Sequence, residues 1–401
     1  MIGVSKLLYG DKNYGDVLRY SRDSHKKCFG THLDYGPVVV WNITRTCNLK
    51  CKHCYSNSDF KKYDELTLDE GKELLRDLAA FKVPVVLFSG GEPLTSSIFF
   101  DLAEYAKSLG FRVTVSTNGT LITKKIAQKL ENIGVSYVGI SLDGIGENND
   151  RFRGVKGAFE EALKGIRNCL DVGQKVGLRF TINRHNVSDL DNMFDLLVEE
   201  NIPRVCFYHL VYSGRAIRDE DIMNEETRRV LDLIVDRTMD MHLKGMNKEV
   251  LTVDNHADGV YIYLKLKQCD GKRAKTALEL LKRNGGNRSG IAIGQVDWKG
   301  DVHIDQFTQN HKLGNVREKK FSEIWTDMQN EFLYKVRNRY KFIKGRCKRC
   351  KWFSVCNGNF RARAEAVYGD FWAQDPACYL TDEEIGAVET NTINNVKALK
   401  V

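Results

Sequence analysis

Six short apolar runs recur in the first half of the chain, and polar segments separate them. Each run is rich in β-branched or aromatic residues and has the length of a buried strand. The first, PVVVWNIT, is apolar almost throughout. The predicted strands lie near residues 37–44, 83–89, 111–117, 137–142, 176–182 and 205–211.

The segments between the runs have the 3.6-residue periodicity of amphipathic helices. In the first, near residues 66–80, Thr67 and Glu70 form a capping box ahead of leucines that repeat on one face. Further helices are predicted near residues 97–109, 123–133, 157–171 and 188–200. Successive strand–helix units predict an α/β fold of parallel strands with right-handed crossovers. Because a complete TIM barrel needs eight units, residues 35–215 are expected to form a partial, TIM-like (β/α)6 barrel.

Three cysteines follow the first predicted strand in the run TRTCNLKCKHCYS. Cys47, Cys51 and Cys54 lie within eight residues, so their thiolates can hold three corners of a 4Fe-4S cluster and leave the fourth iron open. An open metal position is typical of a catalytic site. A structural zinc site is the alternative, but it needs a fourth ligand. His53 is poorly placed for that role because it adjoins Cys54.

Glycines and polar residues mark the ends of the next three predicted strands. Glycine lets the backbone approach a ligand closely, and active-site residues of barrels lie at the carboxyl ends of the strands. The alternative is that the Asn-Gly and Asp-Gly pairs simply form turns. The candidate site residues are Gly90, Gly91, Glu92, Pro93, Ser116, Asn118, Ser141 and Asp143.

The second half of the chain has a different pattern. Residues 216–289 are strongly charged and have helical periodicity, and residues 290–316 predict a β-hairpin that turns at Gly300. Four cysteines follow, at a density typical of zinc or of an iron–sulfur cluster. They are Cys347, Cys350, Cys356 and Cys378. The predicted organisation is an N-terminal extension (1–34), the barrel (35–215), a helical connector (216–289) and a cysteine-rich C-terminal domain (290–401).

Composition favours a large cytoplasmic enzyme. The chain of 401 residues is long enough for two domains, and no apolar run approaches the about 20 residues of a membrane span. Its 11 cysteines are odd in number and fall in metal-ligand spacings, which favours the reducing cytoplasm over a disulfide framework. The formal charge of +8 is spread along the chain. Without a basic–aromatic module it favours an acidic substrate over nucleic acid.

The CxxxCxxC motif with Tyr55 after its last cysteine resembles the signature of the radical S-adenosylmethionine (SAM) enzymes. The resemblance implies that SAM chelates the open iron and is cleaved on reduction to a 5′-deoxyadenosyl radical. The GGEP segment at residues 90–93 is similar to the family's GGE motif, which implies contact with the SAM amino group. Contacts to the SAM ribose or carboxylate are implied for Ser116, Asn118, Ser141 and Asp143.

The second cysteine group resembles the auxiliary-cluster extension called SPASM or twitch. This resemblance implies a second 4Fe-4S cluster on the four cysteines of that group. It is partial, because a full SPASM domain binds two auxiliary clusters and has a cysteine near the hairpin, where this chain has Asp305. Among the other cysteines, Cys169 and Cys206 are predicted to be buried apolar residues, and Cys28 and Cys269 have no assigned role.

Longer segments narrow the resemblance. SLDGIGENNDRFRG, LGNVREK and CNGNFRARA are similar to radical SAM enzymes that trim siroheme-derived tetrapyrroles, the NirJ/AhbC group. The opening MIGVSKL favours resemblance to the AhbC branch, which implies removal of two acetates from 12,18-didecarboxysiroheme to give iron-coproporphyrin in heme biosynthesis. The NirJ branch implies propionate removal in heme d1 biosynthesis. Both imply an iron tetrapyrrole substrate and a flavodoxin- or ferredoxin-like electron donor.

A carboxylate-rich substrate would suit the positive charge, because guanidinium groups pair bidentately with carboxylates. For each candidate side chain an ordinary surface or polar role is the alternative. Alternation along the sixth strand points only one of Tyr208 and His209 into the barrel. The candidate arginines are Arg151, Arg153, Arg179, Arg361 and Arg363, and the candidate axial heme ligands are His256 and His303.

Two other functions compete with tetrapyrrole modification. A radical SAM peptide maturase shares the barrel and the cysteine-rich tail, but the first ~35 residues lack the winged-helix pattern with which such enzymes often bind a leader peptide. An electron carrier with two clusters is the other alternative. The GGEP segment argues against it, because an electron carrier does not need a SAM pocket.

Overall fold

The computed structural model describes residues 1–20, 31 and 35–387. In this part of the chain eleven strands form one sheet, in the order β1-β8-β7-β6-β5-β4-β3-β2-β9-β10-β11. The strands from β9 through β2 to β8 are parallel to one another, and β1, β10 and β11 pair in antiparallel fashion at the two ends of the sheet. Their bounds are β1 (Ile2–Gly3), β2 (Val38–Thr44), β3 (Val85–Gly90), β4 (Arg112–Thr117), β5 (Tyr137–Ser141), β6 (Val176–Ile182), β7 (Arg204–His209), β8 (Glu249–Val253), β9 (Ile293–Val296), β10 (Asp301–His303) and β11 (Gly314–Asn315).

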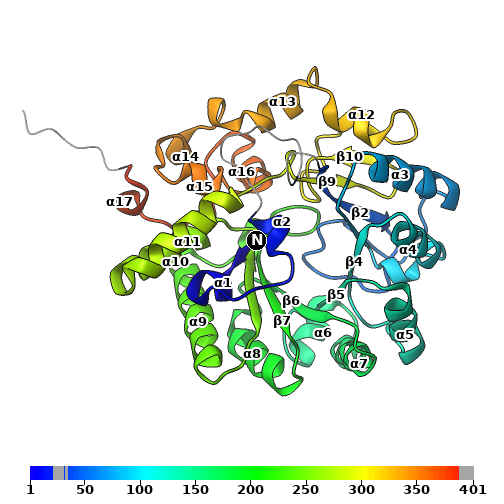
Figure 1. Cartoon of the computed structure of the whole chain (residues 1–401), viewed down its shortest axis with the longest axis horizontal. Coiled ribbons are helices and arrows are strands. Elements are labelled where there is room, and N and C mark those ends of the chain that lie inside the picture. Colours follow the sequence, from blue (N-terminus) through cyan, green and yellow to red (C-terminus); the bar gives the residue numbers. More distant parts are fainter. Residues whose placement is uncertain (21–30, 32–34, 388–401) are drawn as a thin grey trace, which may run out of the picture.

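Helices surround the curved sheet on its outer face, as Figure 1 shows. Those that follow β2 to β6 cover the barrel, and the later ones form the C-terminal region. They are α1 (Val4–Tyr9), α2 (Asp16–Arg19), α3 (Leu68–Ala80), α4 (Phe99–Ser108), α5 (Lys124–Ile133), α6 (Glu147–Arg153), α7 (Ala158–Asp171), α8 (Leu190–Glu199), α9 (Asn224–Leu243), α10 (Ala257–Cys269), α11 (Gly271–Asn284), α12 (Phe321–Thr326), α13 (Glu331–Arg337), α14 (Gly345–Arg349), α15 (Phe353–Cys356), α16 (Arg361–Tyr368) and α17 (Asp382–Ile385).

The predicted α/β barrel is confirmed. Strands β2 to β7 occupy the six apolar runs, in sequential order and parallel register. The run that forms β2 is buried at every position except its first, as expected for a strand covered on both faces. The predicted helices correspond to α3, α4, α5, α7 and α8. No helix in the described residues is long and apolar enough to cross a membrane.

Helix α3 begins with the predicted capping box. The Thr67 hydroxyl accepts from the Glu70 N–H at 3.2 Å, and the Glu70 carboxylate accepts from the Thr67 N–H at 2.8 Å. Because such caps contribute about 1 kcal/mol, Thr67→Ala should lower the free energy of unfolding by about that amount in urea titrations. Thr276→Ala, at an exposed position inside α11, is the control and should change it by less than about 0.5 kcal/mol. Equal effects would contradict a stabilising cap.

The barrel sheet extends past the predicted boundary at residue 215. Strand β8 lies in the segment predicted to be helical, and it pairs with β7 on one side and β1 on the other. Strand β8 was not predicted from the sequence, because EVLTV is only five residues long and lies between charged helices. The predicted hairpin is present as β9 and β10, but β9 also pairs in parallel with β2. The C-terminal region therefore begins as an extension of the barrel sheet.

Candidate active site

A cavity opens at the carboxyl ends of the parallel strands. Its empty space measures about 1080 Å³, including the part that is open to solvent. The cysteine loop after β2, the ends of β3 to β7 and Phe307 from the C-terminal region form its wall. Five of the eight predicted SAM-contact residues lie on this wall. They are Gly90, Gly91, Ser116, Asn118 and Ser141.

The three remaining predicted residues do not line the cavity. Glu92 and Asp143 have no exposed surface, and Pro93 is also buried. Glu92 and Asp143 instead contact residues that form the wall, as described below.

The cysteine loop is held in place by contacts from distant segments. The Lys52 N–H donates to the Phe152 carbonyl at 3.0 Å, which fixes the loop against the end of α6. On its other side Arg215 donates to the carbonyls of Cys51 and Ser58, both at 2.8 Å. Arg215 follows β7 and was not among the predicted residues, because no local motif marks a side chain that hydrogen-bonds a loop 164 positions away.

All three cysteine sulfurs receive hydrogen bonds, which suits thiolates that ligate a cluster. Burial raises the pKa of the Cys47 thiol to about 12, and burial also raises the pKa of Cys51. Ionised sulfurs at these positions need a cation, and cluster iron supplies that charge. The residues present therefore fit the group. The donors are the Leu49 N–H to Cys47 (3.4 Å), Arg153 Nη1 to Cys51 (3.6 Å) and the Ser58 N–H to Cys54 (3.4 Å).

The two glycines of the GGEP segment permit close contact with the cysteine loop. A Cβ atom at Gly90 would lie 2.2 Å from the Thr44 carbonyl oxygen, and one at Gly91 would lie 2.2 Å from that of Thr46. The Gly91 and Glu92 N–H groups donate to these two carbonyls at 2.7 and 2.9 Å. Any side chain at either glycine would push the end of β3 away from the loop.

The Glu92 carboxylate joins the ends of β3 and β4. One oxygen accepts from the Thr117 hydroxyl at 2.7 Å and from the Leu94 N–H at 3.1 Å, and the other accepts from the Asn118 N–H at 2.7 Å. Burial raises its pKa to about 7, although these hydrogen bonds oppose the shift. Every hydrogen-bond partner of the Glu92 carboxylate is a donor, so this position needs a side chain with two acceptor oxygens.

Glu92→Gln should weaken SAM binding about ten- to a hundredfold, the equivalent of one charge-assisted hydrogen bond. The amide nitrogen would face a donor, and the negative charge beside the predicted ammonium position would be lost. Calorimetric titration with SAM of the reconstituted protein measures the effect. Glu104→Gln, on the exposed face of α4, is the matched control. Unchanged SAM affinity in Glu92→Gln would remove Glu92 from the SAM site.

Asp143 anchors Arg153, which does line the cavity. The Asp143 carboxylate accepts from the Thr181 N–H at 2.7 Å, forms an ion pair with Arg153 and lies 3.4 Å from His53 Nε2. Because Arg153 also reaches the Cys51 sulfur, the end of β5 is connected to the cysteine loop through this pair.

The other candidate side chains differ in whether they line the cavity. Tyr208 and His209 both line the cavity, so the expectation that only one of them would do so was wrong. His209 stands at the end of β7, and its Nε2 lies 2.9 Å from an Asp258 carboxylate oxygen. His256 and His303 are buried and do not line this cavity. Asp305 accepts from the Phe307 and Thr308 N–H groups and so shapes its own loop.

The chain matches the model of the radical SAM superfamily over residues 41–197, and that of the iron-sulfur cluster-binding domain SPASM over residues 293–351. It is 56% identical to the Fe-coproporphyrin III synthase of Methanosarcina barkeri, over 97% of this chain and 100% of that protein. It is 43% identical to the pre-heme d1 synthase of Dinoroseobacter shibae, over 91% and 90% of the two chains. It belongs to the NirJ/AhbC group of radical SAM enzymes in heme biosynthesis.

Solved structures agree on the radical SAM fold. Streptococcus suis SuiB bound to the precursor peptide SuiA superposes with a TM-score of 0.70, over 87% of this chain and 77% of that one. Sequence identity is 18%, so the likeness concerns the fold. SAM and iron–sulfur clusters are the cofactors that the radical SAM and SPASM matches imply.

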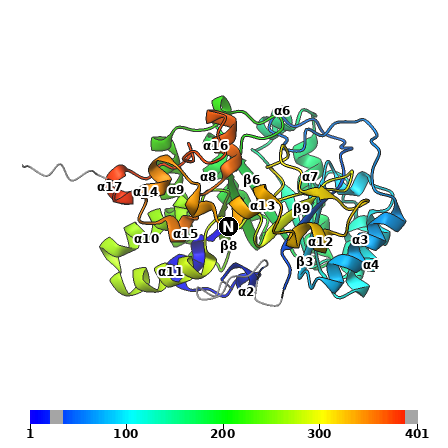
Figure 2. The same cartoon turned by 90° about the horizontal axis from the view of Figure 1, so that it is seen from above.

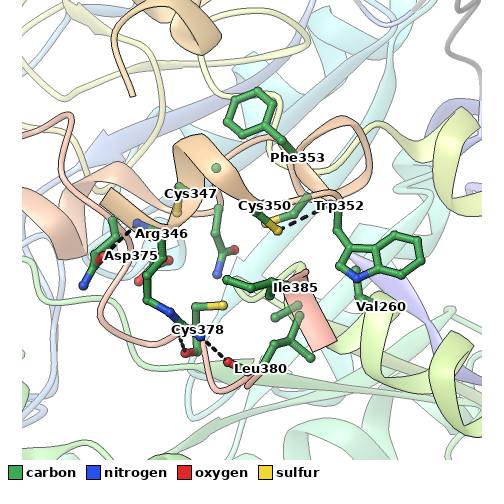
Figure 3. Close-up of a pocket in the computed structure, with 15 residues that line it drawn as sticks. Val260, Arg346, Cys347, Cys350, Trp352, Phe353, Asp375, Cys378, Leu380 and Ile385 are labelled. Atoms are coloured by element: carbon green, nitrogen blue, oxygen red, sulfur yellow. Dashed lines mark hydrogen bonds between the residues drawn. The ribbon is translucent and has the colours of Figure 1, made fainter. Parts of the chain in front are cut away.

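The SPASM-like region of this radical SAM enzyme contains a second cavity, drawn in Figure 3, of about 480 Å³ including its open part. Cys347, Cys350, Cys356 and Cys378 all line it, and most of its other walls are apolar. The predicted second cysteine group is thus brought together around one space. Burial raises the pKa of Cys378 to about 12 and raises the pKa of Cys356 well above its ordinary value, so an ionised sulfur at either position is favoured by a bound metal.

The four cysteines outside both groups line neither cavity where they are described. Cys169 and Cys206 are buried among apolar neighbours, as predicted. Cys269 is exposed at the end of α10, and Cys28 lies outside the described residues.

Proposed function

We propose that this enzyme removes two acetate side chains from 12,18-didecarboxysiroheme and so forms iron-coproporphyrin. The observation that carries the proposal is the 56% identity, over nearly the whole of both chains, to a protein named Fe-coproporphyrin III synthase. Identity to the pre-heme d1 synthase is lower, at 43%. Propionate removal is therefore the second candidate. Peptide maturation has weaker support, from 30% identity to the mycofactocin maturase MftC of Mycolicibacterium smegmatis and from likeness of fold to SuiB.

When bound, SAM and the cluster supply a 5′-deoxyadenosyl radical that abstracts a substrate hydrogen. The protein's part is to hold both reactants in one cavity and exclude water from it. The cysteine loop follows β2, and Ser116 and Asn118 stand at the carboxyl end of β4. Arg179 and Tyr208 come from β6 and β7, which lie further along the sheet. This division supports separate positions for SAM and the tetrapyrrole.

The cofactor set that we propose is one SAM-binding 4Fe-4S cluster and one auxiliary 4Fe-4S cluster. The cavity shared by the four C-terminal cysteines supports the second. Iron analysis of the reconstituted protein should give about eight irons per chain. Four irons with zinc making up the difference would contradict an auxiliary cluster. A flavodoxin- or ferredoxin-like protein is proposed as the electron donor, and the cytoplasm as the location.

Anaerobic turnover with SAM, reductant and 12,18-didecarboxysiroheme, followed by mass analysis, tests the reaction. The product should have lost both acetates and kept all four propionates. Loss of propionate would assign the enzyme to the second candidate function. Unchanged tetrapyrrole in a preparation that cleaves SAM would reject both.

A further inference from the structure

We propose that Arg179 binds a carboxylate of the tetrapyrrole substrate inside the barrel. The inference rests on the proposed function and assigns a specificity-determining residue to it. Carboxylate side chains are what distinguish the substrates of this group chemically, so a cation that recognises them would select and orient the ring.

Arg179 is the cavity arginine whose guanidinium remains uncommitted. Of the three arginines on the wall, Arg153 is paired with Asp143, and Arg215 donates to backbone carbonyls of the cysteine loop. No hydrogen bond or ion pair of the Arg179 side chain is formed with any described residue. A guanidinium carries five N–H donors, and inside a protein such a group calls for an anion.

The other candidate arginines serve elsewhere. Arg363 is buried in an ion pair with Asp375, and Arg361 donates to backbone carbonyls near α16. Arg151 is exposed on α6. Arg179 lines the cavity and has no hydrogen-bond or ion-pair partner among the described residues, so it is the arginine suited to bind an incoming carboxylate.

The neighbouring strands hold Arg179 in place. Its guanidinium carbon lies 4.7 Å from the centre of the Tyr208 ring on β7, a contact that favours a fixed orientation. On β5, a Cβ atom at Gly139 would lie 2.8 Å from Arg179 Cδ. Glycine at 139 therefore provides the space that the arginine stem occupies. A side chain ordered in this way loses little entropy when it binds.

The described wall of the cavity offers Arg179 no ion-pair partner of its own. Asp254 is the acidic residue on the described wall of the cavity, and it forms no ion pair with Arg179. His209 lies against Asp258 rather than toward the arginine. SAM carries a carboxylate as well, so the experiment has to distinguish the two possible sources.

The experiment titrates reconstituted holoenzyme with iron-coproporphyrin III, the product of the proposed reaction, and with its tetramethyl ester, which has no carboxylates. Binding is followed by the porphyrin absorbance, and SAM affinity is measured separately. Arg179→Gln should bind the free acid about ten- to a hundredfold more weakly and the ester as wild type does. Arg179→Lys should lie between, and the surface control Arg151→Gln should match wild type. SAM affinity should not change.

Three results would overturn the inference. Arg179→Gln could bind the free acid as tightly as wild type does, or it could lose the acid and the ester equally, as a packing residue would. Lost SAM affinity with unchanged porphyrin affinity would assign Arg179 to the SAM carboxylate. If the wild type itself binds no iron-coproporphyrin, the proposed function fails and the inference fails with it.

Discussion

Replacing Cys47, Cys51 and Cys54 together by alanine should abolish SAM cleavage and leave the auxiliary cluster in place. These sulfurs line the cavity on a loop that several distant segments hold in place. Without them no ligand remains for the cluster iron, so no site for SAM chelation and reduction is left. The auxiliary cysteines lie in a separate cavity, and their cluster should survive.

Electron paramagnetic resonance of the reduced variant and assay of 5′-deoxyadenosine test this directly. The variant should show one cluster signal and no 5′-deoxyadenosine. Cys269→Ala is the control, because this exposed cysteine lines neither cavity, and it should behave as wild type. Persistent SAM cleavage in the triple variant would mean that the cluster is bound elsewhere.

Arg363→Ala should cause the largest loss of stability. Arg363 is fully buried and donates to Asp375 at 2.8 and 3.0 Å, and to the carbonyls of Leu210 and Asp254 at 3.1 and 2.7 Å. It therefore fixes the cysteine-rich tail to the ends of β7 and β8. Burial alone would raise the pKa of Asp375, yet Arg363 holds it below its ordinary value. Removing the arginine would leave a buried carboxylate without its partner.

Breaking such a buried pair costs about 3–5 kcal/mol, a large part of the total stability of many proteins. Urea unfolding of the variant measures the loss, together with the yield of folded protein. Arg228→Ala is the matched control, since its pair with Glu384 joins the same tail to α9 but is partly exposed. That change should cost less than about 1 kcal/mol. Equal losses in the two variants would contradict the role of Arg363.

The barrel could be predicted from sequence because its signals are local. Each strand of the barrel core is a short apolar run, and the capping box of α3 spans only Thr67 to Glu70. The cysteine loop is equally local, as its three sulfurs follow directly after β2. By contrast β8 was missed, because five residues between two helices carry little pattern of their own.

The division of roles among the site residues could not be predicted. Motif spacing placed Glu92 and Asp143 beside Ser116 and Ser141, but only the tertiary structure shows that both carboxylates stand behind the wall. The same holds for the arginines. Arg363 pairs with an internal carboxylate, whereas Arg179 lines the cavity. Contacts between segments distant in the sequence decide which of these positions an arginine takes. Figure 2 shows one such pair of distant segments, α3 and α12, side by side.

Hydrogen transfer from the tetrapyrrole to the 5′-deoxyadenosyl group is the most direct test that this cavity performs radical chemistry on that substrate. Didecarboxysiroheme labelled with deuterium on its acetate-bearing rings and side chains would be incubated anaerobically with holoenzyme, SAM and reductant. Mass analysis of the 5′-deoxyadenosine should then show deuterium, in step with loss of acetate. Unlabelled 5′-deoxyadenosine alongside a deacetylated product would contradict hydrogen abstraction from the substrate.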